Sequence, residues 1–181
     1  MSSPKNAEVL GQGSWLRLLS RGGWEFVERI GSRGVVMIVA VTDEGRLVLV
    51  EQYRPAVQAR VIELPAGLVG DEAGHEDEAL EDAARRELRE ETGYEAGTME
   101  RLTSGTVSPG SSCESVHVLR ARDLRKIGEG GGVGAEDIRV HEVPLQEVET
   151  WLRERGQEDV RIDLKVWAAR TWAGAGRPSR S

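Results

Sequence analysis

The chain has 181 residues, a length that fits one domain with a sizeable core. Hydrophobic residues make up 39% and charged residues 30% of it, a composition typical of soluble globular proteins. The formal net charge of −7 argues against broad nucleic-acid binding, which needs a basic surface to displace counterions. It does not exclude a small phosphate substrate, because a bound divalent cation reverses the local field.

Neither a membrane span nor a disulfide framework is expected. No stretch is long and apolar enough to cross a membrane, and the first residues lack the apolar core of a signal peptide. The single cysteine, Cys113, cannot form an internal disulfide, and no cysteine and histidine spacing suits zinc. The histidines are isolated in the sequence and receive no role. We therefore expect a cytoplasmic protein that binds neither membranes nor nucleic acid.

The first part of the chain is predicted to form strands. Residues 13–29 alternate apolar and polar side chains around a Gly-Gly turn, which indicates a pair of strands. Residues 35–41 and 46–53 are rich in β-branched side chains, and a turn at residues 42–45 lies between them. Two such runs around a turn predict a β-hairpin.

A short strand, a loop and a helix come next. Residues 61–68 are expected to form the strand, which ends at a proline and a glycine. The polar, glycine-bearing residues 70–78 predict a loop. A helix is then predicted from about Leu80 to Thr92, with Gly93 placed as its C-terminal cap.

The remaining residues are predicted to add strands and two more helices. Strands are expected at residues 101–107, 115–121 and 138–145, a flexible glycine loop at 128–134, and helices at 145–156 and 163–173. The sequence contains no internal repeat. Strands mixed with few helices predict a layered α+β fold.

The helix predicted at residues 80–92 has an unusual distribution of charges. On a wheel at about 100° per residue, its apolar row consists of Leu80, Ala84 and Leu88. Four charged residues fall on the opposite, solvated side: Asp82, Arg85, Arg86 and Arg89. Glu87 and Glu91, four residues apart, land beside the apolar row instead, and Glu90 lies on the flank.

The inward placement of Glu87 and Glu91 has an energetic cost. Carboxylates turned toward packed structure lose hydration and repel each other unless something neutralises them. Mg²⁺ suits this position, because it takes carboxylate oxygens together with waters and substrate phosphates. Arg86 can hold Glu90 through the pairing of residues four apart. The alternative is a surface helix whose inner glutamates extend to the edge of the packed face.

Residues 86–94, RELREETGY, resemble the second half of the Nudix box, the pattern of hydrolases that act on nucleoside diphosphates linked to another group. Seven residues separate Glu78 from Arg86, so Glu78 lies where that box places its upstream glutamate. Gly67 matches the opening glycine, but ten residues separate it from Glu78 where the family has five. Residues 70–77 therefore look like an insertion, which leaves the role of Glu78 open.

The resemblance covers most of the chain and is closest to the ADP-ribose pyrophosphatase branch. Residues 50–68 are similar to the segment that leads into the box in that branch. Pro109 lies about where the branch carries a marker proline. A plain turn at Pro109-Gly110 is the alternative, and together with the box we favour the branch.

This resemblance implies a Nudix-type α/β/α sandwich with a mixed central sheet and an N-terminal antiparallel β segment. The expected boundaries are an N-terminal segment at residues 1–34 and a hydrolase domain at 35–174. The composition of residues 175–181 predicts a disordered tail. The resembling enzymes are homodimers whose N-terminal strands cross onto the partner, and a homodimer is therefore expected here.

The resemblance also implies the metal site. The expected ligands are Ala66, Glu87, Glu90 and Glu91, with Mg²⁺ as the cofactor and Mn²⁺ as a substitute. Arg86 and Glu90 receive catalytic roles. Bound Mg²⁺ polarises the phosphoryl oxygens and lowers the pKa of bound water.

A glutamate outside the helix is expected to act as the general base. Glu114 lies at the spacing seen in bacterial members of the family. Glu136 follows the glycine loop at residues 128–134, which is expected to close over substrate like a lid. Both remain candidates, and we favour Glu136.

Four further residues are candidates for binding substrate. Trp15 and Trp24 resemble the N-terminal tryptophans that stack on adenine in the dimeric ADP-sugar hydrolases, and core packing is the alternative for each. Arg29 and Arg54 match arginines that contact substrate in these enzymes. Their planar guanidinium groups suit a diphosphate or a ribose. A surface salt bridge is their alternative.

The expected activity is the Mg²⁺-dependent hydrolysis of ADP-ribose to AMP and ribose 5-phosphate. Two alternatives stay open. The same chemistry could act on another sugar nucleotide, such as GDP-mannose, or the chain could be a Nudix-fold sensor that binds ADP-ribose without cleaving it. The presence of Glu87, Glu90 and Glu91 argues against the sensor.

Overall fold

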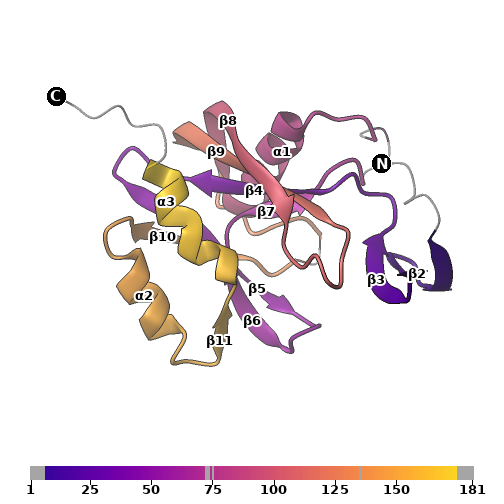
Figure 1. Ribbon diagram of the computed structural model, residues 1–181. Coiled ribbons are helices and arrows are strands. Elements are labelled where there is room, and N and C mark those ends of the chain that lie inside the picture. Colours follow the sequence, from indigo (N-terminus) through magenta and orange to yellow (C-terminus); the bar gives the residue numbers. More distant parts are fainter. Residues whose placement is uncertain (1–6, 72–73, 75, 135, 175–181) are drawn as a thin grey trace.

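The computed structural model describes residues 7–71, 74, 76–134 and 136–174. Strands predominate in these residues and form one three-stranded and two four-stranded sheets, and helices cover the two larger sheets on two sides (Figure 1). None of the described helices is long and apolar enough to cross a membrane. The disordered tail predicted at residues 175–181 lies outside the described residues, and the predicted domain boundaries stay predictions.

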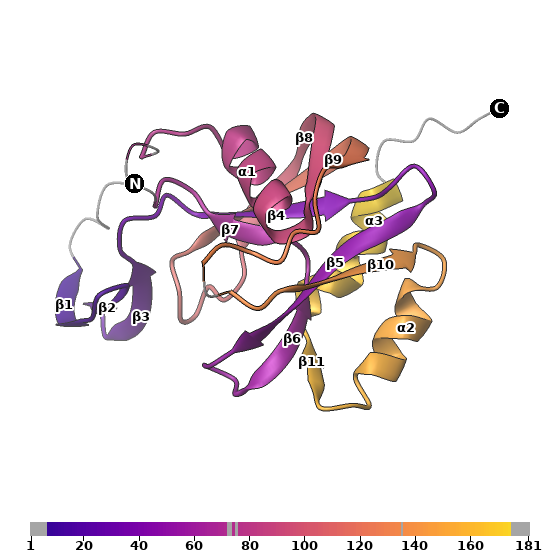
Figure 2. The same ribbon diagram turned by 180° about the vertical axis from the view of Figure 1, so that it is seen from behind.

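The N-terminal sheet is antiparallel and stands to one side of the other two sheets in both ribbon views (Figures 1 and 2). Its strands, in spatial order, are β1 (Glu8–Gln12), β2 (Leu16–Arg21) and β3 (Trp24–Arg29). The predicted strand pair around Gly22-Gly23 is confirmed, and β1 is an additional strand. Val27 joins the sheet to the β8–β9 turn, because its N–H donates to the Ser111 carbonyl at 2.9 Å.

The two larger sheets have the strand orders β7-β4-β9-β8 and β10-β5-β6-β11. Their strands are β4 (Val35–Ala40), β5 (Arg46–Arg54), β6 (Ala59–Glu63), β7 (Ala66–Leu68), β8 (Tyr94–Thr106), β9 (Ser115–Lys126), β10 (Arg139–Pro144) and β11 (Val160–Ile162). Each sheet is mixed, because β4 pairs parallel with β9 and β11 pairs parallel with β6, whereas the other pairs are antiparallel. The predicted α+β fold with mixed strands is confirmed, although the strands divide into two sheets.

The hairpin predicted from residues 35–53 is wrong. Its turn forms, since Gly45 adopts a positive φ of 75° and donates its N–H to the Thr42 carbonyl. However, β4 and β5 enter different sheets, and their pairing is limited to the turn, at the isolated bridge between Val41 and Leu47 and the hydrogen bond from the Thr42 N–H to the Arg46 carbonyl. Both strands are buried almost throughout, so each needs partners and layers on both faces, which a simple two-stranded pairing does not supply.

Two smaller predictions also need correction. The strand expected at residues 61–68 divides at Leu64-Pro65, so that β6 ends at Glu63 and β7 begins at Ala66 in the other sheet. The strand at β10 is not the last one, because β11 follows the next helix. A three-residue strand is too short to leave a periodic pattern in the sequence.

Helices cover both sides of the sheets. They are α1 (Leu80–Thr92), α2 (Val148–Arg155), the 3-10 helix η1 (Leu164–Ala168) and α3 (Ala169–Gly174). Strand β4 lies between two cores, since Val36 and Ile38 pack in the cluster with α1 whereas Met37 and Val39 pack in the cluster with α2, η1 and α3. This alternation places α1 in one outer layer and the C-terminal helices in the other (Figures 1 and 2).

Candidate active site

Helix α1 has the predicted boundaries and cap. Gly93 ends it in the left-handed conformation, with φ 73° and ψ 14°, and donates its N–H to the Arg89 carbonyl at 2.9 Å. Ala84 and Leu88 of the predicted apolar row are fully buried against the sheet, whereas Leu80 is only partly buried. The helix therefore presents one face to the core and fixes the direction of every charge on it.

The helical wheel predicted Arg86 on the solvated face of the helix, and this prediction is wrong. Its side chain is 11% exposed, and its guanidinium contacts Glu78 at 3.1 Å, Glu87 at 2.7 Å and Glu90 at 3.5 Å. It also donates to the Leu68 carbonyl at 3.2 Å, because β7 covers this side of the helix. Burial lowers the pKa of Arg86, but the carboxylates of Glu78 and Glu87 outweigh it and raise the pKa overall.

Glu78 reaches this cluster in spite of the apparent insertion. Its carboxylate accepts hydrogen bonds from the Gly70 N–H and from Arg86, both at 3.1 Å. The loop between β7 and α1 thus returns the upstream glutamate to the helix. Glu78 binds Nη2 of Arg86, whereas Glu87 binds Nη1.

Glu87 and Glu91 lie one turn apart on the inner side of α1. Glu91 is 6% exposed and accepts a hydrogen bond from the Ala66 N–H at 3.0 Å. The carboxylate of Glu87 rests against Gly67, where a Cβ would lie only 1.9 Å from the Glu87 Cδ. Burial raises the pKa of Glu87 to about 7 and that of Glu91 to about 8. Neighbouring carboxylates add to both shifts, Glu90 at Glu87 and Glu87 at Glu91.

A cavity of about 440 Å³ lies beside these two carboxylates, and we call it the α1 pocket. Ala66 and Gly67 of β7 line it. Its charged lining residues are Arg29, Arg54, Glu63, Asp71, Glu87, Glu91, Glu114, Glu136 and Lys165. Acidic and cationic side chains therefore share one hollow. This arrangement can hold a metal ion and the charged phosphates of a substrate together.

Three of the four predicted metal ligands line the α1 pocket, namely Ala66, Glu87 and Glu91. The fourth, Glu90, is not among its lining residues and lies at 3.5 Å from Arg86. Among the described residues, no three acidic, histidine or cysteine side chains converge into a ready-made metal cage. Mg²⁺ needs few protein oxygens when waters and phosphates complete its shell, so the buried pair fits this ion.

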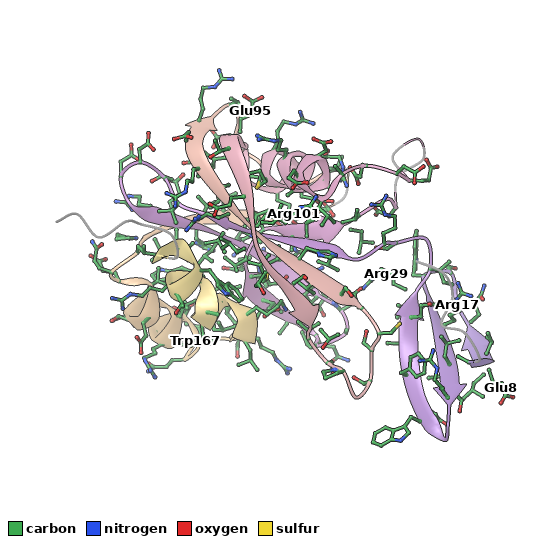
Figure 3. The ribbon with its side chains drawn as sticks, turned by 45° about the horizontal axis from the view of Figure 1, so that its top comes forward. Glu8, Arg17, Arg29, Glu95, Arg101 and Trp167 are labelled. Carbon is green, nitrogen blue, oxygen red and sulfur yellow. The ribbon has the colours of Figure 1, made fainter. Side chains whose placement is uncertain are left out.

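The predicted arginines both line the α1 pocket and both form ion pairs. Arg29 contacts Glu114 at 2.8 Å, and Arg54 contacts Glu63 at 2.7 Å. Each arginine therefore forms an ion pair, and each guanidinium also lines the α1 pocket, so both roles stay open. Arg29 lies where the N-terminal sheet meets the rest of the chain, whereas Arg17 and Glu8 lie farther out on that sheet (Figure 3).

The glycine loop at residues 128–134 is docked rather than free. The N–H groups of Gly131 and Gly132 donate to the carbonyls of Glu91 and Glu90, at 2.9 and 3.0 Å. These bonds satisfy carbonyls in the last turn of α1 that have no partner within the helix. The glycines allow the backbone of the loop to approach the helix closely. In this structure the loop is bound to α1, whereas the sequence predicted a lid that closes over substrate.

The two candidate bases occupy the α1 pocket with different partners. Glu114 is held by Arg29, as described above. Glu136 is exposed, and its carboxylate accepts a hydrogen bond from the Val133 N–H at 2.7 Å. Glu136 lines the same pocket as Glu87 and Glu91, and its charge contributes to the raised pKa of Glu91.

Trp15 and Trp24 are not core residues, so core packing, the alternative to adenine stacking, is wrong for both. Trp15 is 75% exposed and Trp24 is 72% exposed. Neither lines the α1 pocket. Trp24 lines a separate cavity of about 420 Å³ together with Phe26 and Pro109, so the marker proline lies beside the predicted stacking residue.

Comparisons with known proteins agree with this geometry. A model of the NUDIX domain matches residues 31–162. The chain is 36% identical over 134 residues to the ADP-ribose pyrophosphatase of Bacillus subtilis, covering 74% of this chain and 70% of that protein. The methanol dehydrogenase activator of Bacillus methanolicus has the same identity over the same shares. A solved structure described as an ADP compounds hydrolase superposes with a TM-score of 0.69 at 21% identity, covering 96% of this chain and 95% of that chain, which shows a shared fold.

Proposed function

Since the chain belongs to the NUDIX domain family, we propose that it is a hydrolase that cleaves the pyrophosphate of ADP-ribose, or of a related nucleoside diphosphate sugar, into two monophosphates. With ADP-ribose the products are AMP and ribose 5-phosphate. The observation that carries the proposal is the buried pair Glu87 and Glu91 beside a cavity that arginines also line. The similarity to the ADP-ribose pyrophosphatase of Bacillus subtilis supports the substrate.

We propose Mg²⁺ as the cofactor, with Mn²⁺ as a substitute. Glu87 and Glu91 would hold it together with the carbonyl oxygen of Ala66, and Glu90 joins them if it turns away from Arg86. The fit rests on oxygen donors that are buried and mutually repelling, a state that a divalent cation relieves. When bound, the metal supplies charge neutralisation at the phosphoryl oxygens and a more acidic water.

The side chains of the pocket divide the remaining tasks. Arg29 and Arg54 bind the diphosphate or the distal ribose through their planar guanidinium groups. Arg86 keeps Glu87 and Glu90 oriented and therefore acts on the metal ligands. Glu136 accepts the proton of the attacking water as general base. We favour it over Glu114, because Arg29 engages the Glu114 carboxylate directly.

We further propose a homodimer in which the N-terminal sheet covers part of a second copy. Large apolar side chains are exposed on this sheet: Val9, Leu10, Trp15, Leu16, Leu18 and Trp24. Exposed apolar side chains on both faces of so small a sheet are unfavourable in water, and burial in an interface would remove them from water. In this assembly the exposed Trp24 is available to stack on the adenine base. The cytoplasmic location stays a prediction.

The test is a panel of nucleoside diphosphate sugars with Mg²⁺, scored for released nucleoside monophosphate. ADP-ribose should release AMP fastest, and chelation of the metal should stop the reaction. Faster release of GMP from GDP-mannose would favour that substrate instead. Binding of ADP-ribose without any product would favour the sensor, which the presence of Glu87, Glu90 and Glu91 argues against.

A further inference from the structure

The loop that carries Glu136 is anchored at both of its ends. At the first end, Gly131 and Gly132 bond to the last turn of α1, as described above. At the second end, Asp137 is bound by Arg60 of β6, which is 77 residues away in the sequence. Glu136 lies between these anchors, directly beside the second one.

Arg60 donates hydrogen bonds to both the side chain and the backbone of Asp137. Its Nη1 donates to the Asp137 carboxylate at 2.8 Å, and its Nη2 donates to the Asp137 carbonyl oxygen at 3.1 Å. The backbone bond restrains the chain itself, only one residue from Glu136. Arg60 is absent from the lining of the α1 pocket, and its bonds to Asp137 connect it to the loop that carries Glu136.

The guanidinium of Arg60 is itself fixed by a buried carboxylate. Its Nε donates to the Glu51 carboxylate at 2.6 Å, and Glu51 is only 1% exposed at the centre of β5. His141 and Arg155 also contact Glu51, at 2.9 and 3.0 Å. His141 is therefore not isolated, in contrast to the reading of the sequence. Burial raises the pKa of Glu51, but these hydrogen bonds outweigh it and lower the pKa overall.

We propose that Arg60 is a positioning residue for the general base, because it holds Asp137 and thereby keeps Glu136 at the α1 pocket. The proposal rests on the role of Glu136 in the proposed function. A base displaced by about 1 Å from its productive place loses rate steeply, so a fixed loop end affects kcat rather than substrate binding. Glu51 supplies the rigid support, since a buried and fully paired carboxylate does not move easily.

A purely structural role for Arg60 is the competing explanation. Ile138 is buried directly after Asp137, and β10 begins at Arg139, so the strand also restrains the loop. If these contacts suffice, loss of the Arg60 bond changes stability without changing the catalytic step. The two explanations therefore predict different effects of an Arg60 substitution on kcat, and only the positioning role makes that effect depend on Glu136.

The first experiment compares Arg60→Lys with Arg155→Lys. Both arginines contact Glu51 and are similarly buried, with 19% and 25% side-chain exposure, but only Arg60 binds Asp137. A lysine keeps the positive charge and cannot bind Glu51 and Asp137 in the same fork geometry. We expect Arg60→Lys to lower kcat about tenfold with little change in KM, whereas Arg155→Lys keeps kcat. Equal kcat values for the two variants would overturn the proposal.

The second experiment repeats Arg60→Lys in the Glu136→Gln background. If Arg60 acts through Glu136, its substitution costs less than twofold in kcat there. The same tenfold loss in both backgrounds would overturn the proposal. If Glu136→Gln alone leaves kcat unchanged, Glu136 is not the base, and the proposal fails with it. Failure of the proposed function itself is recognised separately, because the unsubstituted protein then releases no monophosphate.

Asp137→Ala provides a variant that leaves the buried cluster intact. The Asp137 side chain is 74% exposed, so its removal should barely change the melting temperature. We expect kcat to fall about threefold, less than for Arg60→Lys, because the bond from Arg60 to the backbone carbonyl remains. An unchanged kcat in Asp137→Ala together with an unchanged kcat in Arg60→Lys would overturn the proposal.

Discussion

Helix α1 and the N-terminal sheet reverse the usual rule of burial in opposite ways. On α1, ionisable side chains are enclosed, as in Glu91 and Arg86, where apolar residues would be expected. On the N-terminal sheet, Trp15 and Trp24 are open to solvent, where polar residues would be expected. Each reversal is unfavourable in the isolated chain, so each points to something that the chain binds.

The difference between the two regions lies in what relieves the cost. Buried carboxylates require positive charge, which Arg86 supplies in part and a divalent cation would complete. Exposed tryptophans require an apolar or aromatic surface, such as a second copy of the chain or a nucleotide base. We therefore propose that α1 supplies the chemistry and that the N-terminal sheet supplies recognition and assembly.

The largest effect is expected at the buried carboxylates. Glu91→Gln should lower kcat by about 10²-fold or more at saturating Mg²⁺, because an amide does not hold the metal as a carboxylate does. The fold should survive, since the amide oxygen still accepts the Ala66 N–H, and burial already disfavours the charge at this position. Steady-state kinetics and a melting curve test this. Asp82→Asn, on the exposed side of the same helix, is the control that should keep its activity.

The next effect separates the two candidate bases. Glu136→Gln should lower kcat about 10²-fold, the usual contribution of a general base. Glu114→Gln should act mainly on KM, because it releases Arg29 from its ion pair without removing the base. Kinetics of both variants with ADP-ribose would decide. A larger kcat loss in Glu114→Gln than in Glu136→Gln would reverse the assignment.

A smaller effect is expected at the aromatic surface. Trp24→Ala should raise KM about tenfold to a hundredfold and change kcat much less, since stacking is worth roughly 1–3 kcal/mol and binds ground and transition states alike. Its melting temperature should hardly change, because the ring is exposed. Trp167→Ala is the matched control, because Trp167 lies beside Arg153 on the side of the molecule away from the N-terminal sheet (Figure 3). Equal KM values for the two variants would remove the stacking role.

The last prediction concerns the oligomeric state of the chain, for which we propose a homodimer. Leu10→Glu places a charge on the apolar surface of β1 and should convert the dimer into a monomer at micromolar concentration. Glu8→Gln, on the same exposed strand, should remain dimeric. Light scattering measures both. If the unsubstituted chain is already a fully active monomer, the proposed assembly is wrong.

The sequence allowed α1 to be predicted well, because its signals are local. The spacing of Glu87 and Glu91 and the glycine at position 93 depend on the helix alone. The burial of Arg86 could not be predicted, since it depends on β7 and on the loop that returns Glu78. A helical wheel describes one helix and contains no neighbours.

Non-local pairing explains the other failures. The runs that became β4 and β5 look like a hairpin, but their partners β9 and β10 lie far along the chain. The exposure of Trp15 and Trp24 also escaped prediction, because a large aromatic side chain suits a core and an interface equally. The contact between Arg60 and Asp137 left no local signal at all.

Mn²⁺ binding followed by electron paramagnetic resonance tests the central claim most directly. The claim is that the inward carboxylates of α1 hold a divalent metal. The unsubstituted protein and Asp82→Asn should remove free Mn²⁺ from solution to the same extent, whereas Glu91→Gln should bind it at least about tenfold more weakly. Equal Mn²⁺ affinity in Glu91→Gln and in the unsubstituted protein would contradict the account.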